Sequence, residues 1–199
     1  YIEQYKDLAI KEMREHGVPA SIVLGVAMHE SGNGTSRIAR VLNNHFGMKG
    51  PNYNQEMRSR YKSYDSAATS YADFSMMLKS RKRFSPLFDT CSIYDYKAWV
   101  LGMQRGRYAA NKAWASRVVA IIKKYNLYEY DNRPADYVEP TYELFPKSVK
   151  LKQRVSYHRI KKGDTLSALA KKYGTRVDKI RHQNHFKTDY LRIGQKLKI

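Results

Sequence analysis

The chain has 199 residues, of which 42% are hydrophobic, and a formal net charge of +19 at pH 7. That length allows one domain or two small ones. The single cysteine, Cys91, excludes an intramolecular disulfide framework. The longest apolar run, residues 22–28 with Gly25 inside it, is too short to cross a membrane.

The charge is distributed unevenly along the chain. Residues 1–128 have a net charge of +10, residues 129–146 of −4, and residues 147–199 of +13. A basic body, an acidic connector and a strongly basic tail indicate an extended anionic partner. No nucleic-acid-binding module is recognisable in the sequence, so we expect no specific nucleic-acid partner.

Helical periodicity dominates the first 125 residues. Residues 2–15 have a helical apolar stripe that Gly17 ends, Val18-Pro19 opens a second helix, and Ser36 caps a short third helix through Val41. Residues 44–63 contain Gly, Pro and Asn without helical period and predict a loop or a short β-excursion. The remaining predictions are a helix capped by Asp65 or Ser66 and running to about Leu78, a turn over 84–88, and helices over 94–105 and 111–125.

The composition of the chain changes after residue 130. Residues 131–150 contain Pro134, Pro140 and Pro146 among several acids and predict an acidic connector. We therefore expect one domain over residues 1–130 and a second over residues 151–199.

Glu30 stands at the end of the apolar helix that begins near residue 20. Ser31, Gly32 and Gly34 break that helix directly after it. A carboxyl group that its helix partly desolvates and that opens toward a groove on its loop side is suited to general-acid catalysis. A solvated Glu near a helix end is the alternative reading of this pattern.

Three neighbouring motifs carry a resemblance to a known family: Glu-Ser-Gly-Asn-Gly at 30–34, Ser-Arg-Ile-Ala at 36–39 and Asn-Asn-His-Phe-Gly-Met-Lys-Gly at 43–50. They resemble glycoside hydrolase family 73, and the segments at 64–66, 106–109 and 121–128 agree. The resemblance implies a mainly α (α+β), lysozyme-like fold with a small β-lobe. It also implies cleavage of the β-1,4 bond after N-acetylglucosamine in peptidoglycan, with Glu30 as the catalytic acid and no cofactor.

The sequence leaves two candidates for the second catalytic group. Glycoside hydrolysis commonly uses two carboxyl groups, and between the Phe46–Gly50 motif and Tyr64 the chain offers only Glu56. In the competing route the acetamido group of the substrate attacks its own anomeric carbon, and Tyr108, in the motif that resembles the family's Gly-Tyr-Ala element, would orient it. The Asp that follows Ala in the family is absent here, where Ala110 and Asn111 stand instead.

Aromatic and polar side chains near these motifs are candidates for contact with sugar rings. By resemblance and position we expect the substrate-binding residues to be His45, Phe46, Tyr53, Tyr61 and Tyr64. His29 and His45 also invite a metal interpretation, but adjacent His29 and Glu30 point apart on a helix, so we expect no metal.

The tail resembles a LysM module with a βααβ fold, on the segments 157–166 and 191–199. Asp164 or Thr165 caps its first helix, Gly174 stops that helix, and Asn184 is expected on the second helix. The resemblance implies recognition of glycans containing N-acetylglucosamine, and the expected glycan-binding residues are Gly163, Asp164, Thr165, Leu166, Asn184 and Ile193.

These features together predict a monomeric peptidoglycan hydrolase tethered to glycan strands. Tyr1 in place of an initiator methionine fits a removed export signal, so we expect an exported protein of the cell envelope: periplasmic, outer-membrane-associated or secreted. The alternatives are a lytic transglycosylase on the same general fold and a non-catalytic wall-binding protein.

Overall fold

A computed structural model describes residues 1–140, 157–186 and 188–199. The chain forms two compact units, Tyr1–Arg133 and Pro134–Ile199. The division falls three residues into the expected connector, whose residues 141–150 lie outside the described part of the chain. Among the described helices, none has the length and apolar character needed to cross a lipid bilayer.

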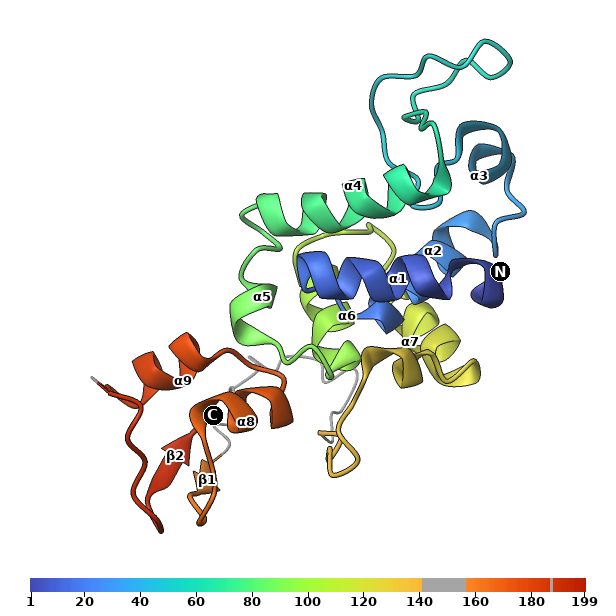
Figure 1. Ribbon diagram of the computed structural model, residues 1–199. Helices are drawn as coiled ribbons and strands as arrows, with labels where there is room; N and C mark the ends of the chain where they lie inside the picture. Colours follow the sequence, from blue (N-terminus) through green and yellow to red (C-terminus); the bar gives the residue numbers. More distant parts are fainter. Residues whose placement is uncertain (141–156, 187) are drawn as a thin grey trace. The chain divides into compact units, whose positions relative to one another are not determined.

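The first unit is helical (Figure 1). Its elements are α1 (Ile2–His16), α2 (Ala20–Ser31), α3 (Arg37–Leu42), α4 (Ala67–Ser80), α5 (Leu87–Thr90), α6 (Tyr96–Arg105), α7 (Trp114–Lys124) and the 3₁₀ helix η1 (Leu127–Asp131). Gly17 ends α1 in a left-handed conformation, and the side chains of Ser36 and Ser66 cap α3 and α4, as their sequence positions predict. The mainly α fold is confirmed.

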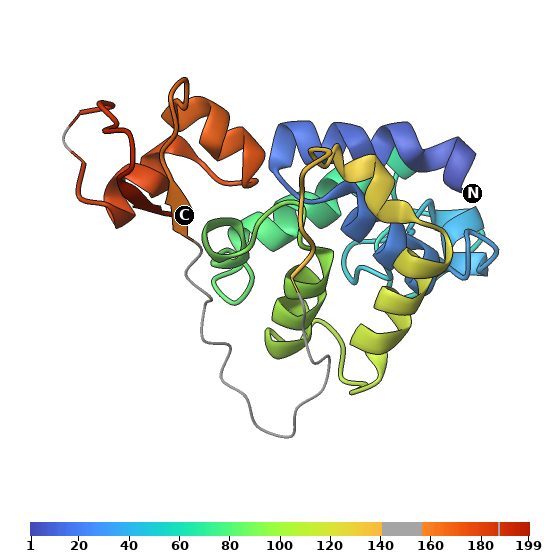
Figure 2. The same cartoon turned by 90° about the horizontal axis from the view of Figure 1, so that it is seen from below.

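Helix α2 is the centre of this unit. Every residue from Ala20 to Met28 is buried, which is the pattern of a helix apolar on all sides. It packs against α1, α7 and η1, and η1 also lies beside α1 (Figure 2). At its N-terminus, the carboxylate of the fully buried Asp131 accepts bonds of 2.7 Å from both the backbone N–H and the hydroxyl of Ser21. The end of the unit is thereby joined to the start of the helix that carries Glu30.

The segment between α3 and α4 extends away from the helices in Figure 1. It contains an isolated antiparallel bridge between Lys49 and Tyr61. The buried Asn44 holds this short ribbon together, because its amide nitrogen donates to the carbonyl oxygens of Met48 and Lys62, each at 2.8 Å, and its oxygen accepts from the Met48 N–H at 3.0 Å. The predicted β-excursion is therefore present as one bridge.

Two short helices were missed by the sequence prediction. Residues 84–88 were expected to be a turn, but Pro86 precedes the single helical turn of α5. Residues 127–131 form η1 directly after α7, bounded by Asn126 and Asn132 in left-handed conformations. Elements of one or two turns have too few residues to show a period, so tertiary contacts decide them.

The second unit contains the βααβ arrangement that the tail predicts. Strand β1 (Tyr157–Arg159) pairs antiparallel with β2 (Lys196–Lys198), and α8 (Leu166–Lys172) and α9 (Val177–Gln183) lie between them in sequence. Its core is Ile160, Leu166, Leu169, Ala170, Ile180 and Leu197. Thr165, not Asp164, caps α8 by accepting from the Ala168 N–H. Asn184 follows α9 and does not belong to it.

Candidate active site

Glu30 lies in the last turn of α2, where the apolar helix meets the Gly32 break. Its side chain is half-buried. One carboxylate oxygen, Oε1, accepts a hydrogen bond of 2.8 Å from the indole Nε1–H of Trp114, the first residue of α7. Trp114 is only 2% exposed, so this bond is shielded from water and holds the carboxyl group in one orientation.

The bond also distinguishes the two oxygens of Glu30. An indole nitrogen only donates, so the oxygen that faces it only accepts. A carbonyl oxygen is a better acceptor than a protonated carboxyl oxygen, so when Glu30 is protonated this bond favours the proton on Oε2. A Cβ atom on Gly47 would stand 4.0 Å from Oε2 and 3.9 Å from the ring edge of Tyr61. Gly47 also has a φ of 63°, a conformation that glycine adopts without strain. The acidic proton thus faces the Gly47 loop and Tyr61.

Tyr108 packs against the indole of Trp114. Its ring centroid is 5.0 Å from that of Trp114, and Phe74 and Phe84 also contact it. Burial, and secondarily the negative charge of Glu30, raises the pKa of Tyr108 well above its ordinary value. Tyr108 therefore keeps its phenolic proton and is available as a hydrogen-bond donor.

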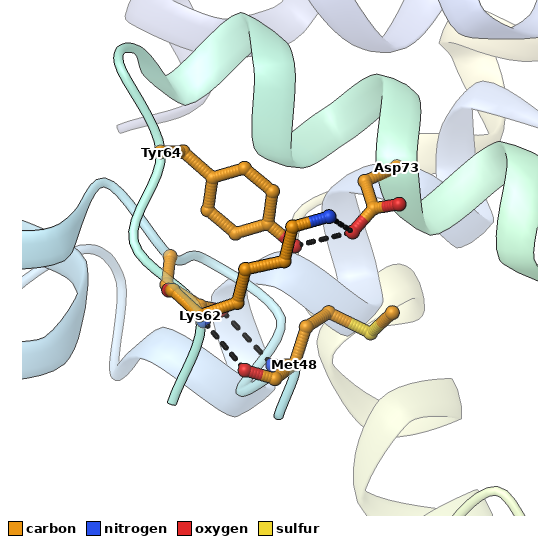
Figure 3. Close-up of polar contacts among 5 residues, drawn as sticks. Met48, Lys62, Tyr64 and Asp73 are labelled. Carbon is orange, nitrogen blue, oxygen red and sulfur yellow. Dashed lines mark hydrogen bonds and ion pairs between the residues drawn. The ribbon is translucent and has the colours of Figure 1, made fainter. Parts of the chain in front are cut away.

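A second polar cluster stands beside the Met48–Lys62 ribbon (Figure 3). The carboxylate of Asp73 on α4 accepts from the Tyr64 hydroxyl at 2.6 Å and from the Lys62 ammonium at 2.8 Å. Burial, then the hydrogen bond and charge of Asp73, raises the pKa of Tyr64. Tyr64 is 9% exposed, so it joins the loop to α4 and presents little surface to a ligand.

Two expected substrate-binding side chains are buried. His45 is 3% exposed, and its Nδ1 is 2.9 Å from the Tyr1 hydroxyl within a cluster that includes Tyr5 and Tyr71. Burial lowers the pKa of His45, which favours the neutral ring. Phe46, also 3% exposed, stacks on Phe74 with ring centroids 4.2 Å apart. These two buried side chains therefore support the Gly47 turn from the core and are not exposed for contact with a ligand.

The expected residues of the extended segment are exposed. Tyr53 is 81% exposed, and Glu56 lies three residues further on in the same surface segment. The Glu56 backbone N–H donates to Asn54, whereas its carboxylate has no hydrogen bond or ion pair with any residue described. The structure brings Glu30, Tyr108 and Tyr61 to one place and puts Tyr53 and Glu56 on the outlying loop.

The expected glycan-binding residues of the second unit divide into two groups. Asp164 accepts from the Lys161 N–H and lies 2.7 Å from His158 Nε2, and it occupies one loop with the exposed Gly163 and Thr165. Ile193 is 71% exposed in the loop before β2. Leu166 is a core residue. The Asn184 amide bonds both the N–H and the carbonyl of Lys198, so it fastens β2.

Sequence reasoning missed Trp114, Asn44 and the Lys62–Asp73 pair. No motif marks Trp114 in the sequence, yet a buried indole N–H needs an acceptor. That need is a usable signal, although the acceptor 84 positions earlier is visible only in three dimensions. Among the residues described, no three His, Cys, Asp or Glu side chains gather to hold a metal ion.

The family model for mannosyl-glycoprotein endo-beta-N-acetylglucosaminidase matches residues 6–127, and the LysM model matches residues 158–199. The chain belongs to the glucosaminidase family. The resemblance of the Glu30 motif to glycoside hydrolase family 73 is thereby confirmed, as is the LysM module in the tail. The glucosaminidase match contains every expected catalytic residue of the first unit and ends just before Asp131.

Among curated relatives, an autolysin from Enterococcus faecalis is 27% identical over 89% of this chain and 27% of its own length. The exo-glucosaminidase LytG from Bacillus subtilis is 28% identical over 58% of this chain and 47% of its own length. The chain therefore spans about a quarter and about half of these two relatives.

Solved structures share the fold of the glucosaminidase unit. The catalytic domain of the autolysin Auto from Listeria monocytogenes is 22% identical, with a TM-score of 0.54 over 65% of this chain and 85% of that domain. The glycoside hydrolase domain of FlgJ from Salmonella typhimurium is 19% identical, with a TM-score of 0.52 over 63% and 86%.

Proposed function

We propose that this chain is a peptidoglycan hydrolase that cleaves the β-1,4 bond after N-acetylglucosamine and is held on its polymer by the LysM unit. The observation that carries the proposal is the bond from Trp114 to Oε1 of Glu30. It gives a lone, half-buried carboxyl group one defined orientation, with its proton on the side of Gly47 and Tyr61. Membership of the glucosaminidase family and an autolysin relative support the substrate class.

In the proposed reaction Glu30 Oε2 donates its proton to the glycosidic oxygen as the bond to the anomeric carbon breaks. General-acid catalysis of this kind contributes about 10²–10⁴-fold. Trp114 then stabilises the carboxylate that remains, because its N–H still donates to Oε1. Tyr61 and the Gly47 backbone border the position of the leaving sugar.

Two routes supply the group that attacks the anomeric carbon. In the first, Glu56 activates a water molecule after its loop closes over bound glycan. Its unpartnered carboxylate and exposed loop support that movement. In the second, the acetamido oxygen of N-acetylglucosamine attacks and Tyr108 orients it. The protonated Tyr108 beside Trp114 supports this route. We favour Glu56, since it is the one carboxylate between the Gly47 loop and Tyr64.

Glu30→Gln tests the function directly. The amide keeps the size of the side chain and removes the acid, so release of muropeptides from purified sacculi should fall by about 10²–10⁴-fold while the melting temperature stays unchanged. Retention of more than about a tenth of wild-type release would contradict the assignment of Glu30. Mass spectrometry of the wild-type products separates hydrolysis, which leaves reducing N-acetylglucosamine ends, from a lytic transglycosylase, which leaves anhydro-muramic ends.

A non-catalytic wall-binding protein is the remaining alternative, and it would release no product from sacculi in either variant. The proposal includes export to the cell envelope and action as a monomer on glycan strands. In the LysM unit we assign sugar contact to the exposed loop residues Gly163, Asp164, Thr165 and Ile193. Leu166 and Asn184 support those loops through the core and through β2.

A further inference from the structure

A group of exposed cationic side chains gathers where α4 and α6 end. These residues, here named the basic rim, are Lys79, Arg81, Lys82, Arg83, Arg105 and Arg107. The two parts of the rim come from separate stretches of sequence. Their like charges repel at short range, so the fold gains no stability from bringing them together.

Close packing at Gly106 joins the two parts. A Cβ on Gly106 would stand 3.0 Å from the backbone oxygen of Arg83 and 2.5 Å from the ring of Phe84. Any other residue would therefore force the ends of α4 and α6 apart. The Arg83 guanidinium lies over the Phe84 ring, 4.9 Å from its centroid, which leaves its charge at the surface.

The rim is continuous with the wall of the candidate active site. Phe84 contacts Tyr108, with ring centroids 6.1 Å apart, and Tyr108 in turn packs on the indole that holds Glu30. The positive charge of Arg81 acts on the Tyr108 hydroxyl in the direction that lowers its pKa, against the larger effect of burial. Arg81 is thus near enough to the tyrosine to affect it electrostatically.

No member of the rim forms an ion pair with a carboxylate in the described part of the chain. Other cations of the protein do: Lys6 pairs with Glu3, Lys62 with Asp73 and Lys172 with Asp136. Arg107 in addition occupies a left-handed backbone conformation, with a φ of 56°, which is unfavourable for a side chain of its kind. Concentrated, unpaired positive charge at the edge of a site is the arrangement of an anion-binding surface.

We propose that the basic rim binds the carboxylates of the stem peptides that peptidoglycan bears beside the bond cleaved by Glu30. This inference rests on the proposed function. Stem peptides are attached through the lactyl group of every second sugar, so each bond after N-acetylglucosamine has a peptide-bearing neighbour. The rim, which the packed rings of Phe84, Tyr108 and Trp114 connect with Glu30, would meet these carboxylates and make the enzyme prefer peptide-bearing over bare glycan.

The test compares two soluble substrates of equal chain length: glycan with its stem peptides, and glycan whose peptides an amidase has removed. Wild-type full-length chain is compared with Arg81→Gln/Arg83→Gln. The matched control, Lys123→Gln/Lys124→Gln, removes two charges from the last turn of α7, distant in sequence from Trp114 at its start. Initial rates give kcat and KM, and binding to each glycan is measured with every variant in a Glu30→Gln background.

The rim variant should show KM on peptide-bearing glycan raised by about threefold to tenfold, in line with two exposed charge contacts. Its kcat, its KM on bare glycan and both constants of the control should be unchanged. At 1 M salt the difference should vanish, because exposed charges are then screened within about 3 Å. Equal losses on both substrates, or none on either, would overturn the rim assignment.

The two proposals fail in different ways. If neither peptide-bearing nor bare glycan is cleaved by the wild type, the hydrolase proposal is wrong, and the binding measurements still decide the rim. If bare glycan is cleaved and the peptides make no difference, the rim proposal is wrong and the hydrolase stands. A rim variant that loses affinity for phosphate-bearing wall polymer but not for peptide-bearing glycan would show that the rim binds phosphate groups. That result would overturn the carboxylate assignment.

Discussion

At the scale of single residues, the contact between Trp114 and Glu30 has the largest consequence. The indole removes one carboxyl oxygen from the reaction and directs the other toward Gly47. In the proposed reaction it also stabilises the carboxylate that remains after proton transfer. Trp114 is therefore a positioning residue, and its role is separable from packing.

Trp114→Phe should lower kcat by about tenfold to a hundredfold and leave KM nearly unchanged. That range corresponds to the free energy of one hydrogen bond to a charged group. Trp99→Phe is the matched control, because that buried indole donates to the Ser92 carbonyl instead. A change in KM alone, or the same fall in kcat in the control, would contradict a role for Trp114 in positioning the acid.

Glu56→Gln and Tyr108→Phe separate the two routes of attack. If Glu56 activates water, its loss should reduce turnover by about 10²–10⁴-fold, and external azide should restore part of it. Tyr108→Phe should then cost little. Initial rates on soluble glycan measure both. Near-wild-type turnover by Glu56→Gln together with a large loss in Tyr108→Phe would assign the reaction to the acetamido route.

Sequence reasoning named Glu30 and Tyr108 from motifs and Tyr61 from its place in the loop segment, and the structure brings all three together. It could not separate side chains that line a site from those that support it. His45 and Phe46 belong to the same motif as Gly47, yet only three-dimensional packing shows that their rings face the core. Contacts that span the chain, such as that of Trp114, leave no local pattern.

At the scale of elements, the helices with a clear period and a cap were predictable. Ser36 and Ser66 begin their helices where short polar side chains precede apolar stripes. The short elements α5 and η1 were not predictable, because contacts with other helices decide them. Helix α5 packs on α6, and η1 packs on α2. For η1 the decisive contact is between Asp131 and Ser21, which replaces a local cap at the start of α2.

Asp131 should make the stability of the first unit depend on pH. Burial raises its pKa from 3.8 to about 7, and the bonds from Ser21 offset this only in part. The folded state then binds a proton more tightly than the unfolded state. Protonated Asp131 therefore contributes its full stabilisation below about pH 4, and this stabilisation is lost as the pH rises through about 7. The loss is of the order of 2–4 kcal/mol.

Urea unfolding of the wild type and Asp131→Asn at pH 4.5 and pH 7.5 measures this effect. The amide can still accept from the Ser21 N–H and can donate to its hydroxyl, so the variant should be as stable at pH 4.5 and more stable than the wild type at pH 7.5. Asp131→Ala, which removes both bonds, serves as the comparison and should be destabilised at both values. If the stability of the wild type relative to Asp131→Asn increased with pH, Asp131 would be charged in the folded state, which would contradict the prediction.

At the scale of the whole molecule, a glucosaminidase unit and a small glycan-binding unit share one chain. Binding through the second unit raises the local concentration of glycan for the first. Deletion of residues 150–199 should therefore reduce binding to insoluble sacculi by about tenfold or more and leave cleavage of short soluble glycans unchanged. Sedimentation with sacculi and rates on soluble chains measure the two effects.

A salt series extends that comparison. Charge attraction by the basic tail weakens as salt rises, whereas uncharged contacts with sugar persist. If the deletion reduced the rate of cleavage equally on soluble and insoluble substrates, the LysM unit would be acting within the active site.

The bond between Ser21 and Asp131 joins positions 110 residues apart. While the chain is being synthesised, the helix that carries Glu30 lacks the acceptor for its first N–H groups until almost the whole unit has left the ribosome. A fragment ended at residue 127, where the family match stops, would never acquire it. The helix that carries Glu30 is thus completed by the last residues of its unit, which ends at Arg133.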